Sequence, residues 1–178
     1  MKKKFINLFI ICFFMLIVVI AIIFGTQEEI LPIGAKLPEI KYIWLGDTLS
    51  IKVDAKPIMI MYFSPDCSHC EYDLIEINKR VNEFVDVDVY LFTADKKFMN
   101  NKLYEKYYNM IKTRNIKFGI VNKDEYKAKF GITITPVFYF FNKHGMLIDK
   151  MTGEIKFSRL RESIQKSDDA QRQISGSN

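Results

Sequence analysis

The strongest constraint on the fold is a pair of cysteines that lies between a strand-like run and a helix-like run. Residues 57–63, PIMIMYF, form a continuous apolar segment of strand length, which is typical of a central strand buried on both faces. Cys67 and Cys70 follow at once, in FSPDCSHC. From Cys70 to about residue 85, apolar side chains recur at spacings of three and four, which predicts an amphipathic helix. The stretch therefore predicts a strand, a Cys-x-x-Cys motif and a helix in direct succession.

Similar patterns divide the rest of the chain. IKYIWL and LSIKV, separated by GDT, predict a β-hairpin over residues 40–53. A second hairpin is predicted from VFYFF and MLIDKM around NKHG, at residues 137–151. The other predicted elements are strands at 87–92 and 116–121 and helices at 96–114, 124–130 and 154–166, the first of these helices placing Phe98, Leu103, Tyr107 and Met110 toward the core. Strands that alternate with helices and end in a hairpin predict an α/β sandwich with a mixed sheet.

The N-terminal part of the chain carries a long apolar segment. Residues 5–24 contain no charge, and a helix of that length spans about 30 Å, the thickness of a bilayer's hydrocarbon core. Lysines precede the segment and TQEE follows it, so the positive-inside rule places the short N-terminal end in the cytoplasm. We therefore expect an anchored chain with its remainder outside the cytoplasm, in a periplasmic location. Cleavage near residue 25 would give a secreted form, but IFG is a poor cleavage site.

These patterns give the expected organisation of the 178 residues. Residues 1–4 are a basic cytoplasmic end, residues 5–24 a transmembrane signal anchor and residues 25–38 a linker. Residues 39–166 form the folded domain, and residues 167–178 are a polar tail that need not be ordered.

Charge argues against nucleic acid as a partner. The net charge is +5, but three of the 26 basic residues precede the apolar segment, so 23 basic residues face 21 acidic ones in the remainder. That part of the chain is close to neutral, and it shows no basic stripe with interleaved aromatic residues. The sequence therefore gives no electrostatic footprint for DNA or RNA.

The expected location decides what the cysteines can do. Outside the cytoplasm disulfides form and persist, and the exported part holds only Cys67 and Cys70, because Cys12 lies inside the apolar segment. As a structural clip the pair would close a very short loop and stabilise little. A zinc site needs four ligands, and only His69 and His144 could add nitrogen donors, so no metal is expected. A redox-active disulfide, without any other cofactor, is the favoured interpretation.

The ordered set of motifs resembles a known family. PIMIMYFSPDCSHC followed by KFGITITPVFYFFNKHGMLI is similar to the thioredoxin fold, and most similar to the membrane-anchored, extracytoplasmic thiol-disulfide oxidoreductases of the TlpA and ResA type. The resemblance runs from about Lys36 to Lys166. It implies a thioredoxin-like mixed sheet flanked by helices, with an N-terminal β-hairpin extension. It also implies protein substrates with cysteines and a thiol electron donor as partners.

The two cysteines have different expected roles. If the helix begins at the motif, Cys67 lies at its N-terminus, where backbone N–H groups and the helix dipole stabilise a thiolate, so Cys67 is the expected nucleophile. Cys70, one turn later, is the expected resolving residue. The resemblance assigns the same roles. Neighbouring residues are expected to tune the pair: Asp66, Ser68 and His69.

Asp73 lies three residues after Cys70 and projects on nearly the same helix face, so its carboxyl could relay a proton to or from the thiols. The resembling family uses a Glu at this position, and this chain has the shorter Asp. A solvated acid that suits the helix N-terminus is the alternative interpretation. The resemblance also implies that Pro136 is cis and packs against the motif, while the backbone of Thr135 binds the substrate chain. A trans proline at the start of an edge strand is the other possibility.

Some residues depart from the family, and they leave the direction of electron flow open. Asp66 stands where thioredoxin-like reductases carry a tryptophan, and Ser68-His69 separates the cysteines. The acids near Cys67 favour a reductant, whereas His69 favours an oxidant. We therefore expect a thiol-disulfide oxidoreductase that reduces protein disulfides. The alternatives are a DsbA-like oxidant or isomerase on the same fold, and a non-catalytic binding module that holds a partner at the edge near Thr135.

Overall fold

The fold is known from a computed structural model, which describes residues 12–18, 30–99, 106–131 and 134–169. Residues 12–18 are helical with exposed side chains. The remaining parts of the predicted anchor, residues 5–11 and 19–24, lie outside the described residues, as does Leu103. Within the described ranges no helix combines the length and the apolar character that crossing a membrane requires.

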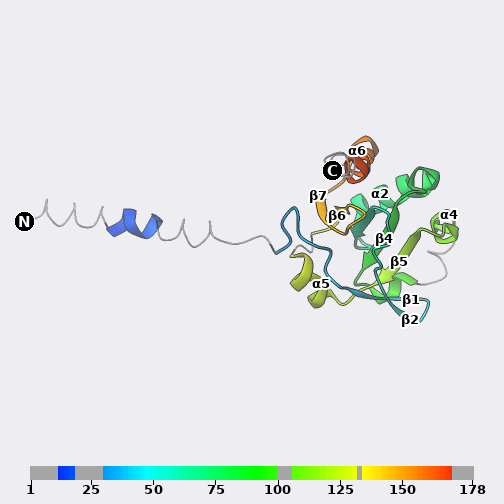
Figure 1. The fold of residues 1–178 in the computed structure, drawn as a ribbon. Helices are drawn as coiled ribbons and strands as arrows, with labels where there is room; N and C mark the ends of the chain where they lie inside the picture. Colours follow the sequence, from blue (N-terminus) through cyan, green and yellow to red (C-terminus); the bar gives the residue numbers. More distant parts are fainter. Residues whose placement is uncertain (1–11, 19–29, 100–105, 132–133, 170–178) are drawn as a thin grey trace, which may run out of the picture.

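A seven-stranded mixed sheet is the centre of the domain (Figure 1). Its order is β2-β1-β5-β4-β3-β6-β7. The central strands β3, β4 and β5 are parallel to one another, and every other neighbouring pair is antiparallel. The strand bounds are β1 Lys41–Trp44, β2 Asp47–Ser50, β3 Ile58–Tyr62, β4 Asp88–Thr93, β5 Ile116–Ile120, β6 Val137–Phe141 and β7 Leu147–Thr152. The mixed α/β sheet with flanking helices that the sequence predicts is confirmed.

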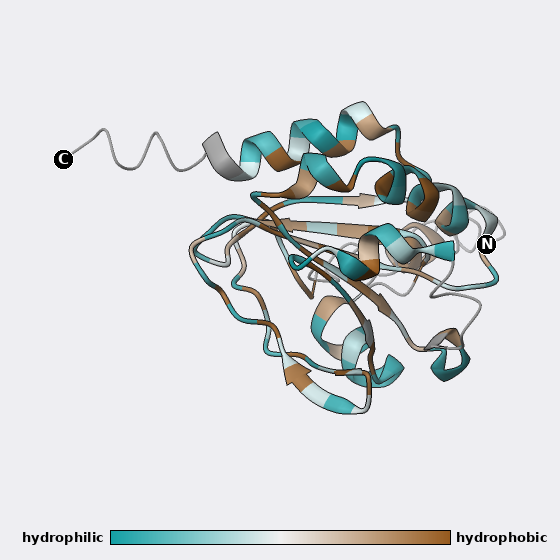
Figure 2. Cartoon of the chain, turned by 90° about the vertical axis from the view of Figure 1, so that its right-hand side faces the viewer, coloured by the Kyte–Doolittle hydropathy of each residue, from teal (hydrophilic) through white to brown (hydrophobic). Residues whose placement is uncertain are grey.

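Helices cover both faces of this sheet, and Figure 2 shows their polar sides turned outward. Helices α2, α4 and α6 lie on one face, and α5 lies on the other. Two 3-10 segments, Val81–Phe84 and Lys96–Met99, connect elements on the first side. The helix bounds are α2 Ser68–Lys79, α4 Tyr108–Lys112, α5 Lys123–Phe130 and α6 Phe157–Asp169.

Strand β3 is fully buried and contributes to a hydrophobic core on each face of the sheet. All five of its residues are buried, and successive side chains point to opposite faces. Met59 and Met61 pack with residues of α2, α4 and α6. Ile60 and Tyr62 pack on the opposite face with residues of α5. The continuous apolar run at 57–63 therefore contains a central strand that is buried on both faces, as predicted, and the cysteine motif follows the end of this strand.

The N-terminal hairpin forms, but its turn is earlier than the sequence indicates. Trp44 pairs with Asp47, so the loop consists of Leu45 and Gly46 instead of GDT. Both loop residues have positive φ, 52° and 91°, as a tight two-residue hairpin turn requires. Leu45 is an unusual residue in that conformation, which is why the sequence does not reveal this turn.

Three predicted helices differ by more than one residue from their bounds in the structure. The helix expected at 96–114 begins as the 3-10 segment Lys96–Met99, and α4 covers only Tyr108–Lys112. The helix expected from Cys70 to about residue 85 begins at Ser68 and ends at Lys79, and a 3-10 segment continues the chain. Arg80 leaves the helical conformation, with φ −122° and ψ 30°, which ends the helix. The last helix, expected at 154–166, runs from Phe157 to Asp169 and buries Ser167, a residue that the sequence assigns to the polar tail. Residues 170–178 lie outside the described part of the chain.

Part of the expected linker packs against the domain. The amide of Gly34 donates to the carbonyl of Leu147 at 2.7 Å, and the amide of Leu37 donates to that of Gly145 at 2.7 Å. Leu31 is buried. Prolines and glycines in this segment suggest a linker. Its backbone N–H and C=O groups nevertheless form hydrogen bonds with the outer edge of the sheet, at the start of strand β7. The folded body therefore begins several residues before residue 39.

Candidate active site

Cys67 lies at the end of the parallel strands where β3 leads into helix α2. It is the N-cap residue of α2, with extended backbone angles of φ −99° and ψ 113°. Its Sγ accepts a hydrogen bond from the amide of Cys70 at 3.2 Å. The side chain is partly exposed, so a reacting sulfur can reach it from solvent. An amide donor aimed at a sulfur is the arrangement that stabilises developing negative charge on it.

Cys70 lies one turn further along α2 and is fully buried. Burial, together with a smaller effect of the Cys67 side chain, raises the pKa of its thiol from the ordinary 9.0 to about 12. At neutral pH this thiol keeps its proton. Cys67 and Cys70 thus differ in their access to solvent, although both are free thiols and only two residues separate them in the sequence.

Thr135 and Pro136 lie beside the cysteines, although 68 positions separate Thr135 from Cys67. The carbonyl oxygen of Thr135 lies 3.7 Å from the Sγ of Cys67, which donates to it. The Thr135–Pro136 peptide bond is cis. Strand β6 begins at the next residue and pairs with β3, which leads into the motif. This strand pairing is what brings the two distant segments together.

Asp73 lies inside the protein, with an exposed fraction of 4%. Its Oδ1 accepts a hydrogen bond from the amide of Ile155 at 3.4 Å, and its Oδ2 has no hydrogen-bond partner in the described part of the chain. Burial raises the pKa of this carboxyl from 3.8 to about 7, Ile155 opposes the rise, and Glu154 adds to it. The interpretation of Asp73 as a solvated first-turn acid is therefore wrong. Its contacts lead toward the β7–α6 loop, and the proton-relay role stays a prediction.

His69, the residue before Cys70, is joined to the same loop. Its Nδ1 lies 2.6 Å from the Oε2 of Glu154, and both side chains are substantially exposed. Glu154 and Ile155 are consecutive, so one short segment contacts the helix at His69 and at Asp73. The segment after β7 therefore contacts the first two turns of α2, once at His69 and once at Asp73.

The other residues near the motif are on the surface. Asp66 and Ser68 are exposed on either side of Cys67. Glu71 pairs with Lys106. Beside Thr135 there is a pocket of about 370 Å³, lined by Tyr62, Phe63, Ser64, Asp66, Thr93, Ala94, Asp95, Lys123 and Thr135. Two of these lining residues are neighbours of Cys67: Asp66 precedes it in the sequence, and the carbonyl of Thr135 accepts from its Sγ.

Sequence reasoning identifies the cysteines and their neighbours but misses Glu154, Ile155 and Lys106. These three contact the first two turns of α2 from positions far away in the sequence. No local pattern marks them, since Glu154 and Ile155 follow a strand in an ordinary loop. Over the described ranges, no group of three or more His, Cys, Asp or Glu side chains is placed to hold a metal ion.

Comparison with known proteins agrees with this geometry. The model of the thioredoxin-like domain family matches residues 47–167. A search of curated proteins found no match.

Among solved structures, a peroxiredoxin-like protein from Aquifex aeolicus has a TM-score of 0.63 at 13% identity, covering 77% of this chain and 88% of that one. A putative thiol:disulfide interchange protein DsbE from Chlorobium tepidum has a TM-score of 0.61 at 12% identity, covering 77% and 98%. A thiol:disulfide interchange protein from a Bacteroides species has a TM-score of 0.58 at 20% identity, covering 77% and 90%.

Proposed function

The chain belongs to the thioredoxin-like domain family, and from that premise we propose that it is a thiol-disulfide oxidoreductase that acts through Cys67 and Cys70. One observation carries the proposal. Cys67 caps helix α2 with its sulfur against the amide of Cys70, 3.7 Å from the carbonyl of Thr135. The partly exposed sulfur of Cys67 can attack a client disulfide, and the buried sulfur of Cys70 can complete the exchange. The backbone of Thr135 beside them can pair with a client chain in an extended conformation. Solved proteins described as thiol:disulfide interchange proteins share the fold, which supports the same activity here.

The proposed reaction transfers two electrons. The Cys67 thiolate attacks one sulfur of a client disulfide, the client S–S bond breaks, and the other client sulfur leaves as a thiolate. Cys70 then loses its proton and attacks the Sγ of Cys67, which breaks the mixed disulfide and releases the second client sulfur. The client becomes a dithiol, and the chain becomes the Cys67–Cys70 disulfide. A dithiol electron donor must reduce that disulfide again.

The second step needs a base, because the pKa of Cys70 is about 12. We assign this role to Asp73, whose pKa of about 7 lets it exchange a proton at neutral pH. Its free Oδ2 is the oxygen available for the transfer. No hydrogen bond joins Asp73 to either sulfur among the residues that the structure describes, so a water molecule would complete the path.

We propose that the chain is a reductant. Asp66 directly precedes Cys67, is exposed and forms no ion pair within the described residues. A carboxylate next to the nucleophile weakens the stabilisation of the reduced form, which makes the dithiol a better electron donor. A protonated His69 would act in the opposite sense, but its contact with the carboxylate of Glu154 would offset that charge.

The membrane anchor and the extracytoplasmic location are also part of the proposal. They rest on the uncharged residues 5–24, on the lysines before them and on the exposed apolar side chains of residues 12–18. The test is to separate membranes from soluble fractions, wash the membranes with alkaline carbonate and determine the N-terminal residue by mass spectrometry. Recovery of the uncleaved chain in the washed membranes is the expected result. Release into the wash, or an N-terminus after residue 24, would contradict the anchor.

The activity is tested by the reduction potential of the Cys67–Cys70 couple. The full chain in neutral detergent, with Cys12→Ser to remove the third thiol, is equilibrated against thiol-disulfide buffers. A potential near or below about −270 mV, the value of thioredoxin, is expected for a reductant. A value near about −120 mV, that of DsbA, would contradict the proposed direction and indicate the oxidant. Failure to exchange at all would leave only the binding module, and Cys67→Ser with Cys70→Ser provides the non-exchanging control.

A further inference from the structure

A second pocket lies at the end of the sheet that is remote from the cysteines. It has a volume of about 480 Å³, within the range of ligand sites. Its walls come from the segment before β3, the residue after the Val81–Phe84 segment and the first residues of β4 and β5. These three strands are parallel and Cys67 follows the carboxyl end of β3, so a pocket at their amino ends is at the opposite end of the domain. Its lining residues are Lys52, Asp54, Lys56, Val85, Asp88, Tyr90, Arg114, Asn115 and Lys117.

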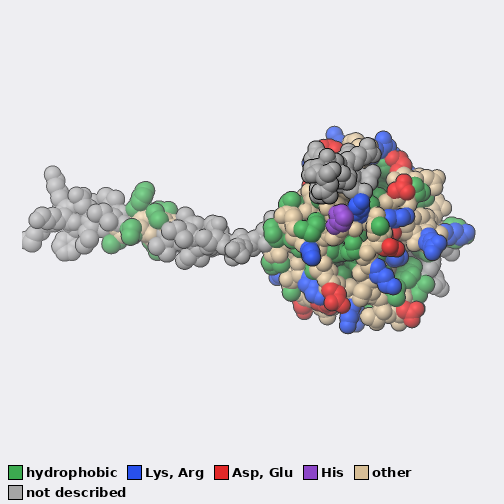
Figure 3. Space-filling view, viewed as in Figure 1, with side chains coloured by type: hydrophobic (Ala, Val, Ile, Leu, Met, Phe, Trp, Pro, Cys, Tyr) green, Lys and Arg blue, Asp and Glu red, His purple; other side chains and the backbone are tan. Residues whose placement is uncertain are grey.

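Positive charge gathers in this pocket, although the folded part of the chain is close to neutral. Four of the lining residues are cations and two are carboxylates, which gives a formal charge of +2. Within the described residues none of the four cations forms an ion pair, whereas other lysines and arginines of the domain do. Figure 3 shows basic side chains in blue and acidic ones in red on one face of the domain. Unpaired cations around a hollow attract an anion more strongly than the same cations on an open surface.

Several contacts hold the walls of the pocket in place. Lys117 Nζ lies 5.2 Å from the centre of the buried Tyr90 ring. Lys56 Nζ donates to the carbonyl of Val85 at 3.2 Å. The side-chain amide of Asn115 donates to the carbonyls of Phe84 and Val87. The wall is therefore ordered before any ligand binds, which lowers the entropic cost of binding.

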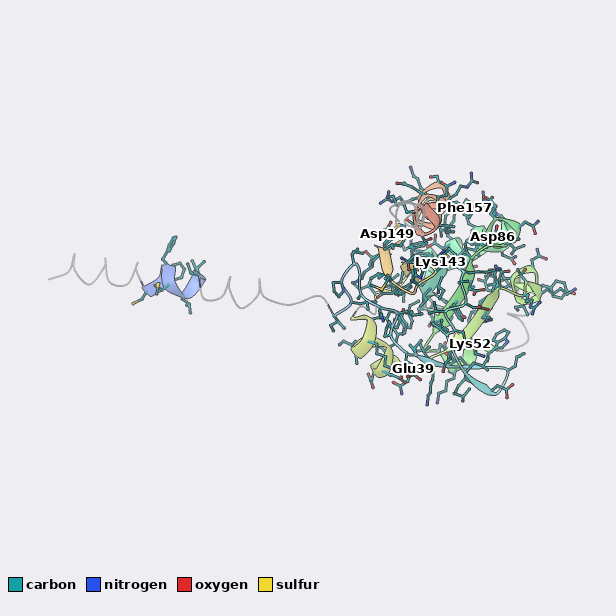
Figure 4. All side chains as sticks on the ribbon, viewed as in Figure 1. Glu39, Lys52, Asp86, Lys143, Asp149 and Phe157 are labelled. Carbon is teal, nitrogen blue, oxygen red and sulfur yellow. The ribbon has the colours of Figure 1, made fainter. Side chains whose placement is uncertain are left out.

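Lys52 and Arg114 complete the positive wall from two other segments. Figure 4 labels Lys52 on the side of the domain that carries β1 and β5. Arg114 lies in the turn before β5, and both side chains are exposed. An arginine presents a planar set of N–H donors that matches phosphate oxygens in pairs, while lysines act as point charges beside it.

We propose that this pocket binds a phosphate group, either free or esterified. A phosphomonoester carries about −1.5 to −2 charges at pH 7 and thus matches the formal charge of +2. A single carboxylate would neutralise only half of it. Asp54 and Asp88 lower the charge of the lining from +4 to +2, which favours a dianion over a longer polyanion.

The test is isothermal titration calorimetry on the full chain in neutral detergent, at constant ionic strength. The probes are sodium phosphate, glycerol 3-phosphate as the esterified form, and sodium acetate as the carboxylate. Lys52→Gln combined with Arg114→Gln removes two cations of the pocket. Lys36→Gln combined with Lys143→Gln is the matched control, because it removes equal charge from residues that do not line the pocket.

Binding of phosphate or glycerol 3-phosphate that weakens at least tenfold in the pocket variant and less than twofold in the control is the expected result. Tenfold tighter binding of glycerol 3-phosphate would identify an esterified phosphate, and equal binding the phosphate group alone. Three results would overturn the proposal: no binding of either phosphate, equal weakening in both double variants, or acetate binding as tight as phosphate. Thiol-disulfide exchange by the pocket variant should match that of the unmodified chain, which shows that it remains folded.

Discussion

The amide of Ile155 donates to the Oδ1 of Asp73 at 3.4 Å, and this bond is the only one that the described structure gives to a buried carboxyl three residues after Cys70. The bond lowers the pKa of Asp73, but burial outweighs it and raises the pKa from 3.8 to about 7. The loop after β7 therefore holds a group that is partly protonated at neutral pH beside the proposed redox pair.

The raised pKa predicts that stability falls as the pH rises. A carboxyl that binds its proton more tightly in the folded protein stabilises the fold fully below pH 3.8, and this contribution is lost as the pH rises to about 7. The loss amounts to at most about 4 kcal/mol, from about 1.4 kcal/mol per pH unit. Asp73→Asn, which carries no charge, should remove this pH dependence. Denaturant unfolding of both proteins at pH 5 and pH 8 measures it, and parallel profiles would contradict the predicted pKa.

The difference in access between the two cysteines predicts ordered alkylation. Cys67 is partly exposed, whereas Cys70 is buried and its pKa is raised to about 12 by that burial. With iodoacetamide at pH 8 we expect Cys67 to be modified at least tenfold faster than Cys70, because the thiolate is the reactive form. Peptide mapping by mass spectrometry separates both sites from Cys12. Equal rates in the folded protein, or faster modification of Cys70, would mean that the assigned nucleophile is wrong.

The proposed relay predicts a specific kinetic defect. Asp73→Asn should slow the release of client from the mixed disulfide by about a hundredfold, since proton transfer by a placed group contributes about that much or more. Capture of a client disulfide by Cys67 should change little, and stopped-flow measurement with a fluorescent disulfide peptide separates the two steps. Asp73→Glu should restore part of the rate. An unchanged release step would assign Asp73 a purely structural part.

The sequence predicts the central part of this site well because its signals are local. A buried strand, two cysteines and an amphipathic helix follow one another, so Cys67 and Cys70 are found without knowledge of the fold. Thr135 and Pro136 depend on the family resemblance, since the pairing of β6 with β3 is not visible in either segment alone. Glu154 and Ile155 remain hidden because their contacts span more than 80 residues. The burial of Asp73 is likewise a property of the packed loop and not of the helix pattern.

Differences in element bounds have the same physical origin. The tight turn at Leu45 and Gly46 requires two residues with positive φ, and the pairing of β1 with β2 outweighs the local preference of a leucine. Residues 31–37 contain a proline and a glycine, as a linker would, but the outer edge of β7 needs backbone partners. Where local propensity is weak, tertiary contacts thus determine the bounds of an element.

Substitutions at Glu154 and at His69 should shift the reduction potential of the cysteine pair in opposite directions. Their side chains meet at 2.6 Å, close to the cysteine pair. Glu154→Gln removes a negative charge near Cys67 and should raise the reduction potential. His69→Gln removes the imidazole that pairs with Glu154 and should lower the reduction potential. Both are exposed, so each shift should be no more than about 20 mV, equivalent to about 1 kcal/mol. Glu162→Gln, which breaks ion pairs on α6 away from the motif, is the matched control and should leave the potential unchanged.

Replacing either of two buried tyrosines on the face of the sheet covered by α5 with phenylalanine should have opposite effects on stability. Tyr126 is fully buried and stacks on Tyr62 and Phe130, and its hydroxyl has no hydrogen-bond partner within the described chain. The hydroxyl of Tyr139 donates to the carbonyl of Phe130 at 3.1 Å. A buried hydroxyl without a partner costs about 1 to 3 kcal/mol, so Tyr126→Phe should raise the free energy of unfolding by about 1 kcal/mol.

Tyr139→Phe should lower the free energy of unfolding by a similar amount, because it leaves a buried carbonyl without its donor. Both substitutions remove one oxygen from a ring that packs in the same core, so the difference between them isolates the hydrogen bond. Denaturant unfolding at a single pH measures both. A loss of stability in Tyr126→Phe equal to that in Tyr139→Phe would show that the Tyr126 hydroxyl has a partner in solution, such as a buried water.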